Sequence, residues 1–147
     1  MIVPRMISIE RLMWMAVGAS TLIGGGIGLI RGASHRVACE SSLWAMPEIS
    51  IGLFPDVGAT YFLSLLPETW AAFLALTGAR LRLTDVLALG LATHSCRQDD
   101  LEAIVEALDA LPPEDCATPQ VASRALDRLL ATFVTPPESL SWSADWP

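Results

Sequence analysis

Two stretches decide the fold expected for this chain: Gly24–Leu29, GGGIGL, and Met46–Gly58, MPEISIGLFPDVG. An apolar run, Leu12–Val17, precedes the first stretch and is expected to be a strand, after which the glycines lead into a short helix. A strand-to-helix turn gathers unpaired N–H groups at the positive end of a helix dipole. Such a turn suits an anion, and its glycines let the backbone approach a reacting carbonyl closely.

The spacing of these glycines excludes two familiar phosphate-binding motifs. A dinucleotide fingerprint needs glycines at i, i+2 and i+5, but Gly24 and Gly26 lead to Leu29, and Gly26 and Gly28 lead to Arg31. The chain contains no lysine, which excludes a P-loop. An oxyanion-type site remains, with close packing of strand and helix as the structural alternative.

The second stretch carries two acids, Glu48 and Asp56, among apolar residues and prolines. Carboxylates in such surroundings are desolvated unless paired, which moves the pKa toward the range used in general acid–base chemistry. The bend at Gly52 allows the two acids to converge on one point. Asp56 as the cap of a helix that begins near Gly58 is the structural alternative.

The remaining elements indicate an α/β chain that ends in helices. Short apolar runs at Arg36–Glu40 and Ser42–Met46 predict buried strands. Apolar periodicity and stop signals predict helices from Gly58 to Pro67, Thr69–Thr77, Thr84–Leu89 capped by Thr84, Asp99–Leu111, and Val121–Phe133. Trp14 and Trp44 are expected in the core, whereas Trp142 and Trp146 lie in a tail without periodicity.

Composition excludes several classes of protein. The chain has 147 residues, 52% hydrophobic and 17% charged, with a net charge of −7. The apolar content excludes a disordered chain, and the acidic balance argues against a nucleic-acid partner. Leu12–Ile30 is uncharged and nearly long enough to span a bilayer, but its glycines break a helix, so no membrane partner is expected.

The three cysteines form no CxxC pair and predict reduced thiols rather than a disulfide framework. His94 and Cys96 would share a face of a strand, which invites a Cys–His nucleophile. Such a nucleophile also needs a third orienting group, so we interpret this spacing as coincidental strand alternation.

The combination of GGGIGL, MPEISIGLFPDVG, FLALTGARL and GLATH in this order resembles the enoyl-CoA hydratase/isomerase (crotonase) superfamily, and within it the 3-hydroxyisobutyryl-CoA hydrolase branch. The resemblance covers Gly18–His94 well and Asp99–Phe133 loosely. It implies a partial crotonase-type ββα superhelix followed by α-helices. It also implies hydrolysis of a short-chain 3-hydroxyacyl-CoA thioester, a reaction of valine degradation.

The resemblance assigns three residues to the site. Gly25 matches the glycine whose N–H is one of two oxyanion donors for the acyl carbonyl. Glu48 matches the glutamate that acts on the acyl carbon, as a nucleophile or as the base for water. Asp56 matches the acid that holds the substrate hydroxyl or the water. No cofactor and no metal are implied, because CoA is part of the substrate.

Two positions favour hydrolysis over hydration. Members that hydrate enoyl thioesters are similar here, but they carry a second glutamate in place of Gly28 and a glycine in place of Asp56. An isomerase or a hydratase of the same superfamily, and a non-catalytic interaction subunit, remain alternatives. Ala59 and the pair Ile30–Arg31 depart from the family pattern and affect the detail of the pocket.

The resemblance also implies that the chain is incomplete at both ends. Residues 1–134 are expected to form a crotonase-like domain without its N-terminal ββα turns, and residues 135–147 an irregular tail. The second oxyanion donor would belong to those turns, so little or no activity is expected of this chain alone. The expected partners are an acyl-CoA substrate and a trimer-type homo-oligomer. The expected location is the cytoplasm, or the mitochondrial matrix in a eukaryote.

Overall fold

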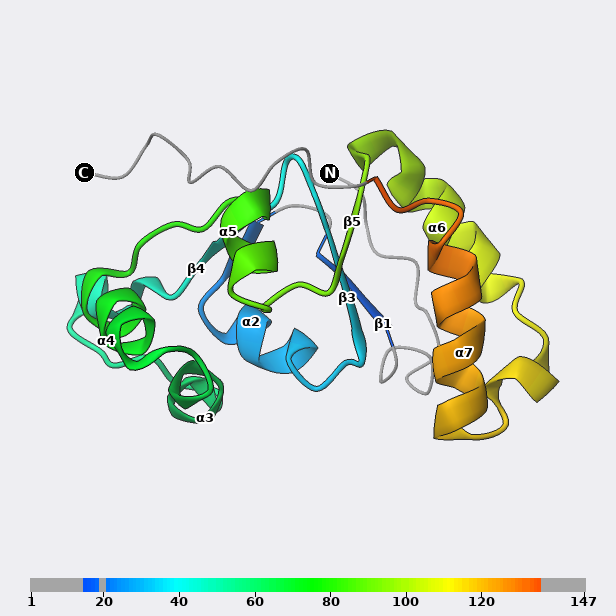
Figure 1. The fold of residues 1–147 in the computed structure, drawn as a ribbon. Coiled ribbons are helices and arrows are strands. Elements are labelled where there is room, and N and C mark those ends of the chain that lie inside the picture. The colour runs from blue at the N-terminus through cyan, green and yellow to red at the C-terminus, as the bar shows by residue number, and fades with distance from the viewer. Residues whose placement is uncertain (1–14, 19–20, 136–147) are drawn as a thin grey trace.

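The computed structural model describes residues 15–18 and 21–135 of the chain, in which short strands alternate with helices (Figure 1). The strands are β1 (Met15–Gly18), β2 (Thr21–Ile23), β3 (His35–Cys39), β4 (Leu43–Ala45) and β5 (His94–Cys96). The α-helices are α2 (Gly25–Ile30), α3 (Ala59–Ser64), α4 (Glu68–Thr77), α5 (Leu83–Ala88), α6 (Leu101–Asp109) and α7 (Pro119–Leu130). The 3₁₀ turns are η1 (Pro47–Ile51), η2 (Gln98–Asp100) and η3 (Pro113–Cys116).

The described strands form two small parallel sheets. One sheet has the order β1-β3-β5, with Val17 opposite Val37 and Val37 opposite His94. The other consists of β2 and β4, with Ile23 opposite Ala45. Because the paired strands are parallel, the segments that follow β2 and β4 leave the sheet at the same end.

Two hydrophobic clusters lie on opposite sides of the three-stranded sheet. In Figure 1, α6 and α7 stand on one side of β1, β3 and β5, whereas α2 and α5 stand on the other. The first cluster includes Ile27 of α2, Trp44 of β4 and Phe62 of α3, and Trp44 is 1% exposed. The second cluster packs Val37 and Cys39 of β3 against the apolar face of α6 and α7. Their apolar residues lie three or four positions apart, as the sequence predicts: Leu101, Ile104, Leu108, Leu126 and Leu130.

The α/β fold class is confirmed, and most predicted elements are present within one or two residues of their expected bounds. The expected strands Arg36–Glu40 and Ser42–Met46 are β3 and β4. Part of the expected strand Leu12–Val17 is β1; residues 12–14, with Trp14, lie outside the described residues, as do Trp142 and Trp146 in the tail.

One predicted cap is wrong. Thr84 does not begin α5, because the helix starts at Leu83 and its N-cap is Arg82. The carboxylate of Asp85 accepts a hydrogen bond from the backbone N–H of Arg82 at 2.8 Å, which satisfies one of the free donors at the helix start. The acid in the first turn therefore stabilises the helix start, rather than the threonine hydroxyl.

Hydrogen bonds from Arg36 connect the beginning of β3 to the segment between α5 and β5. Its buried guanidinium donates hydrogen bonds to the carbonyl oxygens of Leu91 at 2.6 Å, Ala33 at 2.7 Å and Gly90 at 3.2 Å. The backbone of the same residue bonds the Thr93 hydroxyl, so this side of the sheet is held by buried polar contacts.

Among the described residues, no helix combines the length and the apolar character that a bilayer crossing requires. The uncharged run Leu12–Ile30 contains β1, β2 and the short helix α2 in its described part. The expectation that its glycines divide the run is confirmed for these residues.

Candidate active site

The candidate site lies where the parallel strands β2 and β4 end. Gly24 and Gly25 follow β2, and Met46, Pro47 and Glu48 follow β4. The N–H of Gly24 donates to the carbonyl of Ala45 at 2.8 Å, which continues the pairing of the two strands by one residue. The carboxyl ends of parallel strands are the usual place for a ligand in an α/β fold, because the segments leaving them diverge there.

Glu48 is buried beside this glycine turn. Its side chain is 8% exposed, and its Oε1 lies 2.5 Å from the position that a Cβ on Gly24 would occupy. Its Oε2 is buried and has no hydrogen-bond partner in the part of the chain that the structure describes. A buried carboxylate oxygen without a partner is costly, so it marks a place where a substrate, a water or another segment would bind.

Local backbone bonds fix the position of Glu48. Pro47 starts η1, and the carbonyl of Glu48 accepts from the N–H of Leu53 at 3.0 Å. Gly52, at φ 75°, closes the turn in the left-handed conformation. Gly78 at the end of α4 approaches Pro47 so closely that a Cβ would lie 3.1 Å from the Pro47 Cα. The bend predicted at Gly52 is present, and α4 supports it from outside.

Gly24 and Gly25 have the conformation that a close backbone approach requires. Gly24 has φ 58° and ψ −131°, and a side chain there would meet Glu48. Gly25 is the first residue of α2, so its N–H has no acceptor within the helix. The predicted oxyanion donor is thus adjacent to the residue that touches the Glu48 carboxylate.

Asp56 differs from Glu48 in its surroundings. It is exposed, so the expected desolvation applies to Glu48 and not to Asp56. Its side chain does not cap α3: the N-cap is Gly58, and the Asp56 backbone carbonyl accepts from Ala59 N–H at 2.8 Å. The capping role weighed as the structural alternative is therefore absent.

The segment that carries Asp56 nevertheless lies in close contact with α2, through Val57. Val57 has φ 47°, a strained conformation for a β-branched residue. Its Cγ2 lies 3.0 Å from where a Cβ on Gly25 would be, and its carbonyl oxygen lies against Gly28. The structure therefore brings Glu48 to Gly24 and the neighbour of Asp56 to Gly25, around the first turn of one helix.

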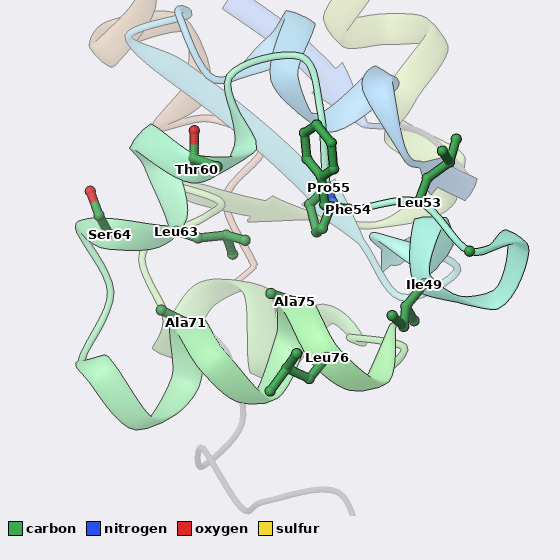
Figure 2. Close-up of a pocket in the computed structure, with 11 residues that line it drawn as sticks. Ile49, Leu53, Phe54, Pro55, Thr60, Leu63, Ser64, Ala71, Ala75 and Leu76 are labelled. Atoms are coloured by element: carbon green, nitrogen blue, oxygen red, sulfur yellow. The ribbon is translucent and has the colours of Figure 1, made fainter.

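An open apolar groove of about 610 Å³ runs beside the site. Ile49, next to Glu48, and Pro55, next to Asp56, both line it. Figure 2 shows Leu63 of α3 above Ala75 and Leu76 of α4, which line it as well. Phe54 is 73% exposed and Leu76 is 70% exposed. The groove suits an apolar group, because polar side chains are few among its lining residues.

His94 and Cys96 do lie on one strand, β5, but they do not form a nucleophile pair. Burial, with a smaller contribution from Cys39, raises the pKa of the Cys96 thiol to about 12. A thiol with that pKa is protonated near neutral pH, whereas the reactive form is the thiolate. This agrees with the interpretation of the spacing as strand alternation.

Gly28 is the position at which the resemblance places a second glutamate in members that hydrate enoyl thioesters. A Cβ there would overlap the carbonyl oxygen of Val57 and lie 2.8 Å from the Val57 Cγ1. We expect Gly28→Ala to lower the free energy of unfolding by ~1–3 kcal/mol, because a backbone carbonyl must move to make room. Urea denaturation followed by circular dichroism measures the change.

Gly26 provides the matched control, because it lies in the same helix and its Cβ would make an ordinary contact of 3.6 Å with Leu22. Gly26→Ala is expected to leave stability unchanged or raise it by up to ~1 kcal/mol, the gain of alanine over glycine in a helix. Equal stability of the two variants would contradict the close approach of Val57.

Comparison with known proteins gives three consistent findings. The family model described as enoyl-CoA hydratase/isomerase matches residues 10–144. The chain is 44% identical over 106 residues to 3-hydroxyisobutyryl-CoA hydrolase 1 of Arabidopsis thaliana, which covers 72% of the chain and 27% of that protein. It is 52% identical over 89 residues to the mitochondrial 3-hydroxyisobutyryl-CoA hydrolase of Rattus norvegicus, covering 60% and 23%. The chain thus spans about a quarter of the length of these curated relatives.

Solved structures share the fold. The chain superposes on a carnitinyl-CoA dehydratase from Mycobacterium thermoresistibile with a TM-score of 0.68 and 29% identity, covering 86% of this chain and 34% of that one. An enoyl-CoA hydratase from Rhodobacter sphaeroides gives a TM-score of 0.61 and 30% identity, covering 83% and 41%.

Proposed function

Because the chain belongs to the enoyl-CoA hydratase/isomerase family, we propose that it forms the reacting centre of a CoA-thioester hydrolase for short-chain 3-hydroxyacyl groups such as 3-hydroxyisobutyryl. The observation that carries the proposal is the buried Oε2 of Glu48, which has no hydrogen-bond partner among residues 15–18 and 21–135. The Glu48 carboxylate lies beside Gly24, and the N–H of the next residue, Gly25, has no acceptor within α2. A nucleophile or base and a hydrogen-bond donor at one point are what thioester cleavage requires.

The proposed reaction assigns one role to each of the three predicted residues. The acyl carbonyl oxygen accepts a hydrogen bond from Gly25 N–H, which stabilises the negative charge that develops on that oxygen. Glu48 attacks the carbonyl carbon, or takes a proton from the water that attacks it. When Glu48 is the nucleophile, the C–S bond breaks to leave the acyl group on Glu48 as an anhydride, which water hydrolyses to the free acid and the carboxylate. When Glu48 is the base, the oxygen of water bonds to the carbonyl carbon, and the C–S bond breaks. In both routes the CoA thiolate leaves as the thiol with a proton that comes from water. The exposed Asp56 holds the substrate hydroxyl or the water.

Gly28 supports hydrolysis over hydration. A hydratase of this family pattern would need a second glutamate at this position, and Val57 occupies the space that its Cβ would need. The site therefore has Glu48 as its one buried acid among the described residues near Gly24. Glu48 with Asp56 is then the working pair, which favours hydrolysis over the addition of water to a double bond by two glutamates.

A second candidate function, that of an interaction subunit, is favoured by the apolar side chains exposed around the groove. Ile51, Phe54, Tyr61 and Leu76 are each at least 70% exposed, more apolar surface than one small region of a monomer usually presents to water. A homo-oligomer of the trimer type would cover such a surface. The protein would act on an acyl-CoA thioester in the cytoplasm, or in the mitochondrial matrix as in the relatives named mitochondrial.

A substrate panel tests the proposed function. Under single-turnover conditions, with the chain in excess, we expect slow release of CoA thiol from 3-hydroxyisobutyryl-CoA and slower release from isobutyryl-CoA, which lacks the hydroxyl for Asp56. Crotonyl-CoA should keep its double bond, which is followed by absorbance. Loss of that absorbance without thiol release would favour a hydratase, and a folded chain that forms a stable oligomer but binds none of these thioesters would favour the interaction subunit.

A further inference from the structure

Away from the candidate active site, three side chains with metal-binding atoms meet at the boundary between the three-stranded sheet and the last helix. His35 is the first residue of β3, His94 is the first residue of β5, and Asp127 lies on α7. One ligand atom from each of the three lies within 4.8 Å of the other two. His35 is 4% exposed, whereas the Asp127 side chain is 62% exposed.

The sheet register explains why the two histidines are neighbours. Val37 pairs with His94 across parallel strands, and residues two apart on a strand point to the same face. His35, Val37 and His94 therefore share the face that α6 and α7 cover. The imidazole rings stack with centroids 5.3 Å apart and planes 18° apart. On α7, Asp127 follows Leu126, which is buried in the same interface.

Thr93 contacts Nδ1 of the His94 ring. Its hydroxyl accepts from Arg36 N–H at 2.7 Å and lies 2.8 Å from His94 Nδ1. In the tautomer with the proton on Nδ1, this nitrogen donates to the Thr93 hydroxyl, and Nε2 is the unprotonated imidazole nitrogen, the form that binds metals.

Each ring nitrogen of His35 has a hydrogen-bond partner. Its Nε2 lies 3.1 Å from Asp127 Oδ1, and its Nδ1 lies 2.8 Å from the Ser34 hydroxyl. Metal-binding histidines commonly donate their second ring N–H to an oxygen, which orients the ring. Both histidines have such an oxygen at Nδ1, namely Thr93 Oγ1 and Ser34 Oγ.

We propose that His35 Nε2, His94 Nε2 and Asp127 Oδ1 bind one divalent ion of the zinc class. Two imidazoles and one carboxylate suit Zn²⁺, Co²⁺ or Ni²⁺, and a fourth position remains open to water on the exposed side. With Nε2 of His35 bound to the ion, the proton of the neutral ring is on Nδ1, which donates it to Ser34 Oγ.

To bind one ion, the three side chains must move closer together, and the exposure of two of them allows this movement. Tetrahedral zinc with bonds of about 2.0–2.1 Å places its ligand atoms roughly 3.3 Å apart. The three ligand atoms, now within 4.8 Å of one another, must therefore approach by up to about 1.5 Å. The two imidazole planes, now 18° apart, must also turn so that the lone pair of each ring points at the ion. Asp127 is exposed and His94 is half-buried, so these two side chains can move toward the fixed, buried His35.

The ion would join β3, β5 and α7, three elements that are far apart in the sequence: His35 and Asp127 are 92 residues apart. It would therefore strengthen the attachment of the last described helix to the sheet.

Calorimetric titration of the untagged 147-residue chain with Zn²⁺ tests the proposal. We expect one ion per chain and a rise in Tm with Zn²⁺, because an ion that binds only the folded state stabilises it. Asp127→Asn keeps the shape of an exposed side chain and is expected to weaken binding by at least tenfold, as loss of outer-shell partners alone costs ~10–100-fold. His94→Gln, at the half-buried ligand, should weaken it similarly.

Glu106→Gln is the matched control, because Glu106 is an exposed acid on the neighbouring helix α6. It should bind Zn²⁺ as the unmodified chain does. Co²⁺ spectra distinguish the ligands: nitrogen and oxygen ligands are expected, whereas thiolate charge-transfer bands would assign the ion to cysteines and overturn the proposal. Absence of binding by a chain that circular dichroism shows to be folded would overturn it, as would equal affinity of Asp127→Asn and the control.

Discussion

Glu48→Gln is expected to reduce the rate of thiol release from 3-hydroxyisobutyryl-CoA by ~10²–10⁴-fold, the usual contribution of a positioned acid or base. Glutamine keeps the size and shape of the side chain but cannot attack the acyl carbon or take a proton from water. The measurement is single-turnover thiol release, with the chain in excess over the substrate. The rate of thiol release without protein is subtracted from the rates measured with the unmodified chain and with the variant.

The same substitution should leave the fold intact or stabilise it. The Glu48 carboxylate is buried, and one of its oxygens has no partner among the described residues, so removal of its charge relieves a desolvation cost. Circular dichroism and urea denaturation measure this separately from activity. A variant that is equally stable and hydrolyses the thioester as fast as the unmodified chain would show that Glu48 takes no part in the reaction.

Local signals in the sequence predict the elements that local interactions determine. GGGIGL predicts the turn from β2 into α2, because glycine is needed where Gly24 adopts φ 58° and meets Glu48. Gly78 and Gly90 predict the ends of α4 and α5. The error at the start of α5 has the same local origin: two residues, Thr84 and Asp85, could both supply an oxygen, and the choice depends on where the helix begins.

The parts of the site that depend on distant contacts could not be predicted in the same way. The apolar residues around Glu48 and Asp56 predict that both acids are desolvated, but only Glu48 is buried, because the chain turns Asp56 outward after Pro55. The approach of Val57 to Gly28 joins segments that no periodicity relates. The cluster of His35, His94 and Asp127 requires the register of β3 with β5 and the position of α7. Strand alternation groups His94 with Cys96 but gives no sign of His35.

Gly25→Pro is expected to lower the rate of thiol release by ~10²–10³-fold, equivalent to ~2.7–4 kcal/mol, because proline lacks the N–H that would stabilise the developing oxyanion. The first position of a helix is where proline is favoured, since the N–H of that residue has no acceptor within the helix. Gly25 holds this position in α2. Gly24, at φ 58° and ψ −131°, lies outside the helical region that a following proline disfavours.

Gly25→Ala makes this a test of the N–H group rather than of space. Alanine and proline both add a Cβ, which would lie 3.0 Å from the Val57 Cγ2, so both variants carry the same crowding against that methyl group. They differ in the N–H, which alanine keeps. If the donor stabilises the transition state, the alanine variant retains most of the rate and the proline variant loses it, mainly in kcat rather than KM. Equal losses in the two variants would assign the effect to crowding at Val57 and remove Gly25 from the oxyanion site.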